Sequence, residues 1–353
     1  MRIKLAILEK DIGYLNRIES VLSTRYSDSF QLYSFTDPEI AVAALAPERI
    51  DIFLANVEFD IDFNRVPKRC GFAYFVDSAD VETVNEKMAI CKFQKVEMIF
   101  KQILSLFSEN SGMVASVSTG NFSSRVVIFC APSGGVGSSS MAAACATHFA
   151  SMGQKTLYLN LEMFGAADEF FCAEGQFDMS DIIFALKSKK TNLALKLESC
   201  VKVDKSGVYF YSRSKVALDM LELNVKEIVH LIDEIKKSAL YENIVVDMDF
   251  FLNKNVFDIY ELAHSVVWVD DGSEISNDKT MRAFNAISIM EQEMENTVTN
   301  KLSIVYNKFS NKSCKPIDED SIRNIGGTPR YDHANSYQVI SQLSGMELFN
   351  KIF

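Results

Sequence analysis

Short, almost continuously apolar runs recur along this chain, and stretches with helical spacing separate most of them. Such runs are typical of strands that are buried on both faces of a sheet. Their alternation with helices predicts an α/β fold with doubly wound, largely parallel sheets. The runs that we interpret as strands are RIKLAILEK, FQLYSFTD, IDIFLANVE, GFAYFVDS, RVVIFCAP, KTLYLNLE, GVYFYS, ENIVVDMD, HSVVWVDD and KLSIVYNK.

The length of the chain predicts two domains. It has 353 residues, whereas a single core rarely grows beyond about 250–300 residues. The small, polar stretch ENSGMVASVSTGNF interrupts the alternation at 109–122, and we interpret it as a linker. The sequence therefore predicts two doubly wound α/β domains, at residues 1–108 and 123–353. Ligands bind such sheets at the carboxyl ends of the strands, so functional side chains are expected there.

Charge and composition argue against several classes of protein. The net charge of −11 disfavours non-specific binding to nucleic acid, which needs a basic surface. No apolar run approaches the roughly 18 residues of a membrane span, and the N-terminal residues lack the pattern of a signal peptide. The seven cysteines form no CxxC pair and the four histidines are scattered. Neither a disulfide framework nor a His/Cys metal site is expected, and the chain is expected in the cytoplasm.

A glycine-rich loop, SGGVGSSS, joins the strand RVVIFC to a helix of small residues. Gly134, Gly135 and Gly137 allow the backbone to curl so that several N–H groups point inward, next to the positive end of the helix. The phosphate-binding pattern G-x-x-x-x-G-K-[ST] is incomplete, because Pro132 and Ser138 occupy its first Gly and its Lys positions. The loop taken alone leaves two interpretations open, a nucleotide site and a tight corner between strand and helix.

The first domain resembles a response-regulator receiver domain over its whole length. Acidic residues follow its first strand, but the position of the phospho-accepting aspartate is Asn56. An amide cannot form an acyl phosphate and contributes no charge to a Mg²⁺ site. The resemblance therefore implies a docking or dimerising module that is not a phosphorylation switch. The residues that match the family's site are Glu9, Asp11, Asn56, Ser78 and Lys95.

The stretch SGGVGSSSMAAACATHFASMGQKTLYLNLE resembles the MinD/ParA family of deviant Walker ATPases. The family's signature lysine falls on Ser133 and its second lysine on Ser138. The metal-binding threonine falls on Ser139, and the next threonine on Ser140. The acidic pair that follows the family's second strand, which takes part in catalysis, falls on Asn160 and Glu162.

Later segments resemble the same family in the same order. YENIVVDMDFF resembles the Walker B strand and implies that Asp247 holds Mg²⁺ through water, together with Ser139. IVYNKF implies that Asn307 reads adenine, and IGGTPRYD implies that Pro329 and Arg330 close over the base and sugar. The ligands that the resemblance implies are ATP and Mg²⁺. The residues that it assigns to the nucleotide are Ser133, Gly134, Gly135, Val136, Gly137, Ser138, Ser139, Ser140, Asn307, Pro329 and Arg330.

The absence of both loop lysines bears more on hydrolysis than on binding. Main-chain N–H groups form the core of such a nest, so binding of ATP is expected. A lysine or arginine at the γ-phosphate is worth on the order of 10³–10⁵ in rate, so at most weak ATPase activity is expected. Arg213, Lys215 and Lys254 are candidates for a substitute cation, because they lie in loops after strands.

A receiver-like domain without its aspartate, followed by a MinD/ParA-like domain, resembles the TadZ/CpaE family of Flp/Tad type IV pilus proteins. The resemblance implies a cytoplasmic hub, at a cell pole or another assembly site, whose homodimer ATP stabilises. Its implied partners are pilus and secretion proteins, without nucleic acid or direct membrane binding. Two alternatives stay open. One is an active MinD/ParA-like ATPase that cycles on membrane or DNA, and the other is a scaffold that binds no nucleotide.

Overall fold

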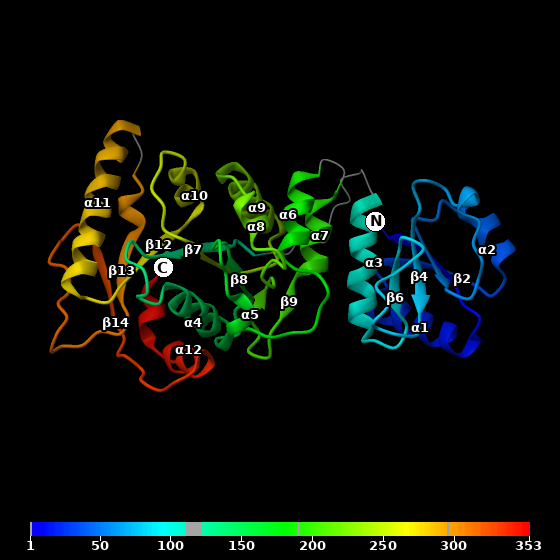
Figure 1. Ribbon diagram of the computed structural model, residues 1–353, viewed down its shortest axis with the longest axis horizontal. Coiled ribbons are helices and arrows are strands. Elements are labelled where there is room, and N and C mark those ends of the chain that lie inside the picture. The colour runs from blue at the N-terminus through cyan, green and yellow to red at the C-terminus, as the bar shows by residue number, and fades with distance from the viewer. Residues whose placement is uncertain (1, 111–121, 189–190, 295–296) are drawn as a thin grey trace. The chain divides into compact units, whose positions relative to one another are not determined.

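The computed structural model describes residues 2–110, 122–188, 191–294 and 297–353. These residues form two compact units, Met1–Val117 with Phe184–Cys200, and Ser118–Ile183 with Val201–Phe353 (Figure 1). The division differs from the boundaries expected from sequence, because 184–200 is counted with the first unit. Most of the expected linker, residues 111–121, lies outside the described residues. Within the described ranges, no helix has both the length and the apolar character needed to cross a membrane.

The first unit contains a six-stranded sheet with strand order β2-β1-β3-β4-β6-β5. Its strands are parallel except for β5, which pairs with β6 as a hairpin. The strands are β1 (Ile3–Leu8), β2 (Phe30–Phe35), β3 (Ile52–Asn56), β4 (Gly71–Val76), β5 (Thr83–Val84) and β6 (Lys87–Cys91). The helices are α1 (Ile12–Arg25), α2 (Pro38–Leu45), η1 (Phe63–Arg65), α3 (Val96–Asn110) and α7 (Leu193–Cys200).

Both faces of this sheet are buried, as the apolar strands predict. Successive side chains of a strand point to opposite faces, so Leu5 and Ile7 join one core cluster while Ala6 and Leu8 join the other. Helices α1 and α3 cover the first cluster, and α2 covers the second. This arrangement confirms a doubly wound α/β domain.

Helix α7 is far from the rest of the first unit in sequence but packs against α3. Leu195 joins the same apolar cluster as the α3 side chains. The backbone N–H of Asn192 donates to the carbonyl of Ser108 at 3.0 Å. Lys196 is buried, and its Nζ lies 2.8 Å from Ser105 Oγ and 3.1 Å from Glu109 Oε1. Apolar and polar contacts together therefore attach α7 to this unit.

The second unit contains an eight-stranded sheet with strand order β14-β13-β12-β7-β11-β8-β10-β9, in which only the β9–β10 pair is antiparallel. Its strands are β7 (Arg125–Cys130), β8 (Thr156–Asn160), β9 (Lys202–Val203), β10 (Tyr209–Phe210), β11 (Asn243–Asp247), β12 (Ser265–Asp270), β13 (Leu302–Tyr306) and β14 (Arg323–Gly327). Its helices are α4 (Ser138–Ser151), α5 (Ala167–Phe170), α8 (Leu218–Leu221), α9 (Val225–Ser238), α10 (Val256–Leu262), α11 (Glu274–Met294), η2 (Thr299–Lys301), α12 (Ser336–Ser344) and η3 (Glu347–Lys351). Helix α6 (Met179–Lys187) crosses the division, which falls after Ile183.

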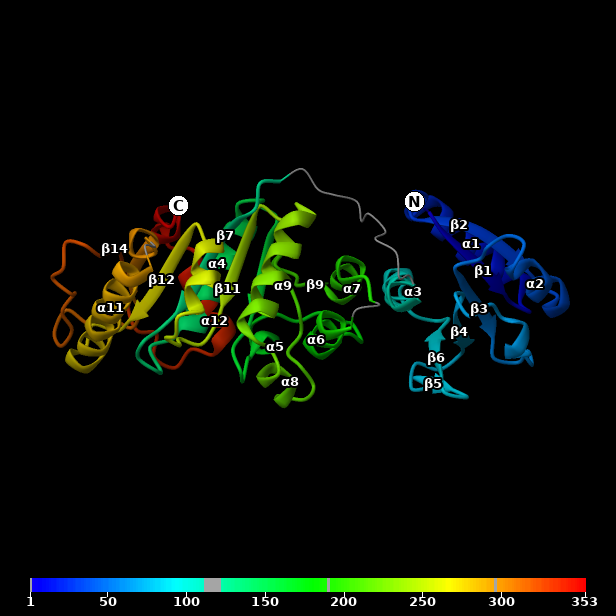
Figure 2. The same ribbon diagram turned by 90° about the horizontal axis from the view of Figure 1, so that it is seen from above.

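Helices cover both faces of this second sheet. Helices α4 and α12 lie on one face, and α9 and α10 lie on the other (Figure 1 and Figure 2). The small side chains at 142–146 of α4 are fully buried, which lets this helix lie close to the sheet. The loop before α4 follows the central strand β7, and β11 lies beside it. The carboxyl ends of β7, β8 and β11 therefore meet at the start of α4.

Candidate functional site

The loop 131–137 has a backbone that requires glycine. Gly135 and Gly137 have φ angles of 78° and 90°, in the left-handed region that favours glycine. A Cβ atom on Gly137 would lie 2.4 Å from Asn307 Nδ2, so no larger residue fits there without displacing that side chain. Gly137 is also the N-cap of α4 and supplies no capping side chain. The first N–H groups of α4 therefore remain available to an anion.

Asp247 ends β11 beside this loop and is completely buried. Its Oδ2 accepts hydrogen bonds from the Tyr158 hydroxyl at 2.7 Å and from Asn160 Nδ2 at 3.0 Å. Its Oδ1 has no hydrogen-bond partner among the described residues. Burial, and then the charge of Glu162, raise the pKa of Asp247 well above its ordinary value. This carboxyl group is thus held ready for a cation.

Glu162 and Ser139 complete a polar cluster around Asp247. Glu162 Oε1 accepts from Ser139 Oγ at 2.8 Å, and its Oε2 accepts from Asn160 Nδ2 at 3.0 Å. The cluster brings together four residues from three separate segments, Ser139, Asn160, Glu162 and Asp247. The sequence-based assignment did not include Tyr158, although it lies two residues before Asn160 on β8 and so points to the same face.

The oxygen atoms of this cluster fit a magnesium ion. Hydroxyl and carboxylate oxygens are the ligands that Mg²⁺ prefers, and the unpartnered Oδ1 of Asp247 is a buried acceptor without a proton donor in the described chain. No group of three or more His, Cys, Asp and Glu that could hold a metal occurs in that part of the chain. Phosphate oxygens and water would therefore have to complete the coordination shell.

Asn307 and Lys308 reach the loop from the end of β13. Asn307 is buried, and its Nδ2 donates to the carbonyl of Val136 at 2.8 Å. Its Oδ1 accepts from Thr328 Oγ1 at 2.9 Å and from the Lys308 N–H at 3.0 Å. Lys308 Nζ donates to the carbonyl of Gly135 at 2.7 Å. Lys308 is a cation at the loop that the sequence did not single out.

The remaining nucleotide candidates occupy varied positions. Ser133 is buried, Ser138 Oγ is buried without a partner among the described residues, and Ser140 is half-buried in the first turn of α4. Pro329 borders a cavity of about 440 Å³, whereas Arg330 is exposed and paired with Asp332 at 3.0 Å. The cavity is lined by Tyr306, Phe309, Asn311, Pro316, Asn324, Gly326, Gly327, Thr328 and Pro329.

The three predicted substitute cations divide into two groups. Arg213 and Lys215 line a second cavity, of about 320 Å³, to which Asn160 and Glu162 of the polar cluster also contribute. Lys254 is exposed, and its Nζ lies 3.8 Å from a carboxylate oxygen of Glu293. Lys308 alone of these four cations has a hydrogen bond to the glycine loop in the described contacts.

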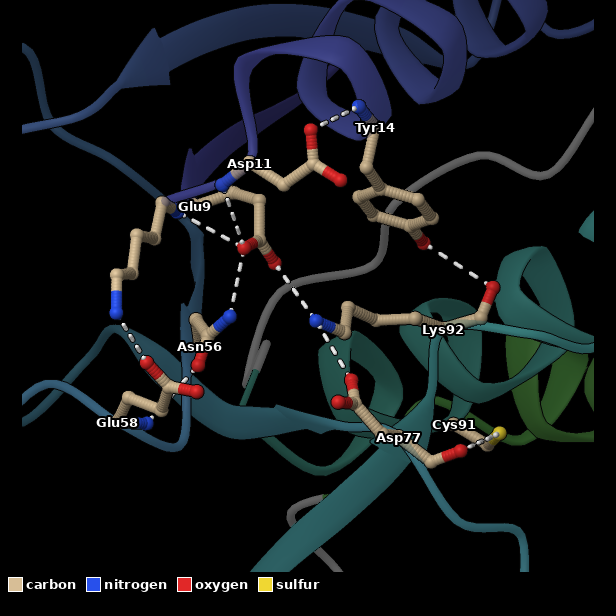
Figure 3. Close-up of polar contacts among 9 residues, drawn as sticks. Glu9, Asp11, Tyr14, Asn56, Glu58, Asp77, Cys91 and Lys92 are labelled. Carbon is tan, nitrogen blue, oxygen red and sulfur yellow. Dashed lines mark hydrogen bonds and ion pairs between the residues drawn. The ribbon is translucent and has the colours of Figure 1, made fainter.

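The receiver-like site forms a closed polar network around Glu9 (Figure 3). Glu9 is fully buried, and its Oε1 accepts from Asn56 Nδ2 at 2.6 Å. Lys92 Nζ lies 3.5 Å from Glu9 Oε2 and 2.7 Å from Asp77 Oδ1. Burial opposes the charged form of Lys92, but its hydrogen bond to Asp77 and the charge of Glu9 raise its pKa. An ammonium group thus lies beside the acidic residues of this site.

The other predicted receiver residues lie around this network or beyond it. Asp11 accepts from the N–H of Tyr14 and caps α1. Ser78 is exposed and contacts Asp80. The lysine that contacts Glu9 is Lys92, which directly follows β6, while the predicted Lys95 is exposed just before α3. The sequence interpretation missed β6, and this displaced the lysine assignment by three residues.

Different known proteins resemble different parts of this chain. Residues 1–108 match the family model described as TadZ-like, receiver domain. No curated protein sequence matches the chain. A ParA family ATPase from Chlorobium tepidum TLS has a TM-score of 0.50 and 18% identity, with 65% of this chain and 96% of that chain covered. The MinC:MinD cell division protein complex from Aquifex aeolicus has a TM-score of 0.46 and 16% identity, with 63% and 97% covered.

The ParA family likeness concerns the fold of the second part of the chain. At 18% identity it shows the arrangement of strands and helices and not the ligands of the site. The chain thus joins a TadZ-like receiver domain to a domain with the ParA-family ATPase fold, and in this it matches a TadZ/CpaE-like protein.

Proposed function

We propose that this chain binds ATP with Mg²⁺ at the loop between β7 and α4, and that ATP stabilises a homodimer. The homodimer would serve as a cytoplasmic hub for the assembly and localisation of a Flp/Tad-type pilus machinery. The observation that carries the proposal is the convergence at one sheet edge of a glycine loop, an open helix N-terminus and the cluster of Ser139, Glu162 and Asp247.

Several groups around the loop suit the phosphates. The loop and the first turn of α4 offer main-chain N–H groups, and the positive end of the helix favours negative charge. The buried Ser138 Oγ, which has no partner in the described chain, would gain one from a phosphate oxygen. The cavity beside Thr328 and Pro329 has the size and the mixed lining typical of a small-molecule site. The adenine base would occupy this cavity.

Magnesium would be held by Ser139 and, directly or through water, by Asp247. When bound, the ion would neutralise phosphate charge and fix the orientation of the phosphate chain. Asn160 and Tyr158 keep their hydrogen bonds to Asp247 Oδ2 and so aim the free Oδ1. Asn160 Nδ2 donates to both Glu162 and Asp247. Glu162 would orient a water or a metal ligand. These residues would bind and position the nucleotide, even where hydrolysis is slow.

Slow or absent hydrolysis follows from the charge balance of the loop. Ser133 and Ser138 stand where the MinD/ParA family has lysines, and a cation at the γ-phosphate is worth on the order of 10³–10⁵ in rate. ATP would then act chiefly as a ligand. A ligand that binds only the dimer shifts association by linkage and needs no turnover.

The receiver-like domain would contribute a constant docking surface. Asn56 offers no carboxylate to phosphorylate, and Glu9 is already paired with Asn56 and Lys92. Docking to this domain is therefore expected to be independent of phosphorylation. Pilus and secretion proteins are the proposed partners, without nucleic acid or direct contact with the membrane.

Calorimetry with ATP and Mg²⁺, followed by light scattering of the complex, tests the proposal. We expect saturable binding, a shift from monomer to dimer, and loss of the Mg²⁺-dependent part of the affinity in Asp247→Asn. The absence of any binding heat would favour the nucleotide-free scaffold. Turnover stimulated by DNA or lipid vesicles would favour the cycling ATPase. Normal pilus formation in cells that lack the protein would contradict the assembly role.

A further inference from the structure

Two adjacent residues on the β13–β14 connection hold two adjacent carbonyls of the glycine loop. Asn307 Nδ2 donates to Val136 O at 2.8 Å, and Lys308 Nζ donates to Gly135 O at 2.7 Å. We propose that Asn307 and Lys308 are the positioning residues of the anion nest. The proposal rests on the proposed function, since it concerns polyphosphate binding at the same loop.

The geometry of the peptide bond connects these hydrogen bonds to the nest. A trans peptide carries its N–H and its C=O on opposite sides, and the peptide bonds of the described loop are trans. The carbonyl of Gly135 shares its peptide unit with the N–H of Val136, and the carbonyl of Val136 shares its unit with the N–H of Gly137. Holding both carbonyls therefore directs both N–H groups away from Asn307 and Lys308, into the concave side of the loop.

The Oδ1 atom of Asn307 already accepts two hydrogen bonds. A carbonyl oxygen has two lone pairs, and Oδ1 of Asn307 already accepts from Thr328 Oγ1 and from the Lys308 N–H. It has no acceptor capacity left for the amino group of a base. Gly137 leaves the space that Nδ2 occupies, because a Cβ there would lie 2.4 Å from it. Asn307 thus shapes the loop, and its Oδ1 cannot accept from the amino group of a base.

Lys308 is held in an unusual backbone conformation by the same network. Its φ of 58° is left-handed, which is uncommon for a residue other than glycine. Its N–H and its ammonium group both form hydrogen bonds, to Asn307 and to Gly135. Ser133 and Ser138 provide no charge at the loop, and Lys308 is the cation that contacts it.

Binding of ATP and of inorganic tripolyphosphate to the full chain, each with Mg²⁺, separates positioning from base reading. We expect Lys308→Met and Asn307→Asp to weaken both ligands by a similar factor of about tenfold, the size of one charge-assisted hydrogen bond. Lys308→Arg should recover most of the affinity. Lys312→Met removes the same charge from the same connection and should change neither. A loss confined to ATP in Asn307→Asp, with tripolyphosphate unchanged, would overturn the proposal.

A measurement without ligand keeps the inference separate from the proposed function. If the unaltered chain binds neither ligand, the proposed function fails, but the positioning role is still testable by NMR order parameters of the amides at 134–137. Lys308→Met should lower them and Lys312→Met should not. Unchanged order in Lys308→Met would refute the positioning role. Should Asn307→Asp fail to fold, Lys308→Met alone decides both experiments.

Discussion

At the scale of single residues, the two domains treat buried carboxylates in opposite ways. Glu9 Oε1 accepts from Asn56 Nδ2, and Glu9 Oε2, which has no hydrogen-bond partner among the described residues, lies 3.5 Å from the Lys92 ammonium group, so the charge of Glu9 is compensated within the protein. Asp247 has neutral donors on one oxygen and no partner in the described chain on the other, with a second carboxylate nearby. The protein thus places a positive charge beside Glu9 and, among the described contacts, no cation beside Asp247.

Binding of Mg²⁺ with ATP is expected to weaken as the pH falls. Because the pKa of Asp247 is raised, this carboxyl takes up its proton at a higher pH than an ordinary aspartate, and a metal must displace that proton. We expect calorimetry to show lower Mg²⁺-dependent affinity and greater proton release at about pH 6 than at about pH 8. Asp247→Asn should remove the pH dependence. Equal affinities at both pH values in the unaltered chain would contradict the displacement of a proton from the Asp247 carboxyl by the metal.

Restoring the aspartate of a receiver site is expected to destabilise the first unit. Asn56→Asp removes the donor 2.6 Å from Glu9 Oε1 and places two carboxylates side by side in a buried site. An unpaired buried charge costs about 3–5 kcal/mol of unfolding free energy. The loss should shrink as the pH falls, because protonation of one carboxyl restores a donor. Urea unfolding monitored by circular dichroism at neutral and acidic pH measures it, with Asn64→Asp as an exposed control.

At the scale of elements, the loop before α4 is determined by what approaches it. The three glycines have different roles, since a Cβ on Gly134 or Gly135 would meet nothing within 4 Å, whereas one on Gly137 would meet Asn307. The short side chains of α4 are a separate requirement that comes from the sheet beneath it. Loop and helix therefore depend on residues that are distant in sequence, directly after β13 and on β11.

Gly137→Ala is expected to impair polyphosphate binding, and Gly153→Ala supplies a matched control. Both glycines have left-handed φ angles, 90° and 79°, so alanine costs roughly 1–2 kcal/mol of stability at either position. Only at Gly137 does the added Cβ also meet a side chain. We therefore expect Gly137→Ala to lower the melting temperature at least as much as Gly153→Ala does, and a loss of ATP affinity in Gly137→Ala alone. Equal affinities in the two variants would mean that the Asn307 contact does not shape the site.

Most elements, and the edge at which the site lies, could be predicted from the sequence, since buried parallel strands are long apolar runs. The strands β5, β6, β9 and β14 were missed, because they are short or carry polar residues. Lys92 was missed together with β6. Tyr158 could have been inferred from its place two residues before Asn160 on the same strand. Lys308 depends on which way its side chain points across the sheet edge, and no local pattern reveals this. The attachment of α7 to α3 is a long-range contact and equally invisible in sequence.

At the scale of the whole molecule, the single tryptophan offers a test of how the chain is divided. Trp268 is fully buried in β12 of the second unit, whereas Leu195 on α7 belongs to the core of the first. Leu195→Ala should destabilise the first unit by about 2–5 kcal/mol, the usual cost of such a cavity. We expect an earlier unfolding transition in circular dichroism and an unchanged midpoint in Trp268 fluorescence. A shift of the fluorescence transition alone would place α7 with the second unit.

The assignment of α7 to the first unit also affects how this gene could be recombined. The chain passes between the two units after residues 117, 183 and 200, so the coding region of the first unit is interrupted by part of the second. A receiver domain moved into another gene as one continuous segment would leave behind the helix that covers α3. We expect the two modules to be inherited together, and chimeras of related genes to remain folded only when both segments come from the same parent.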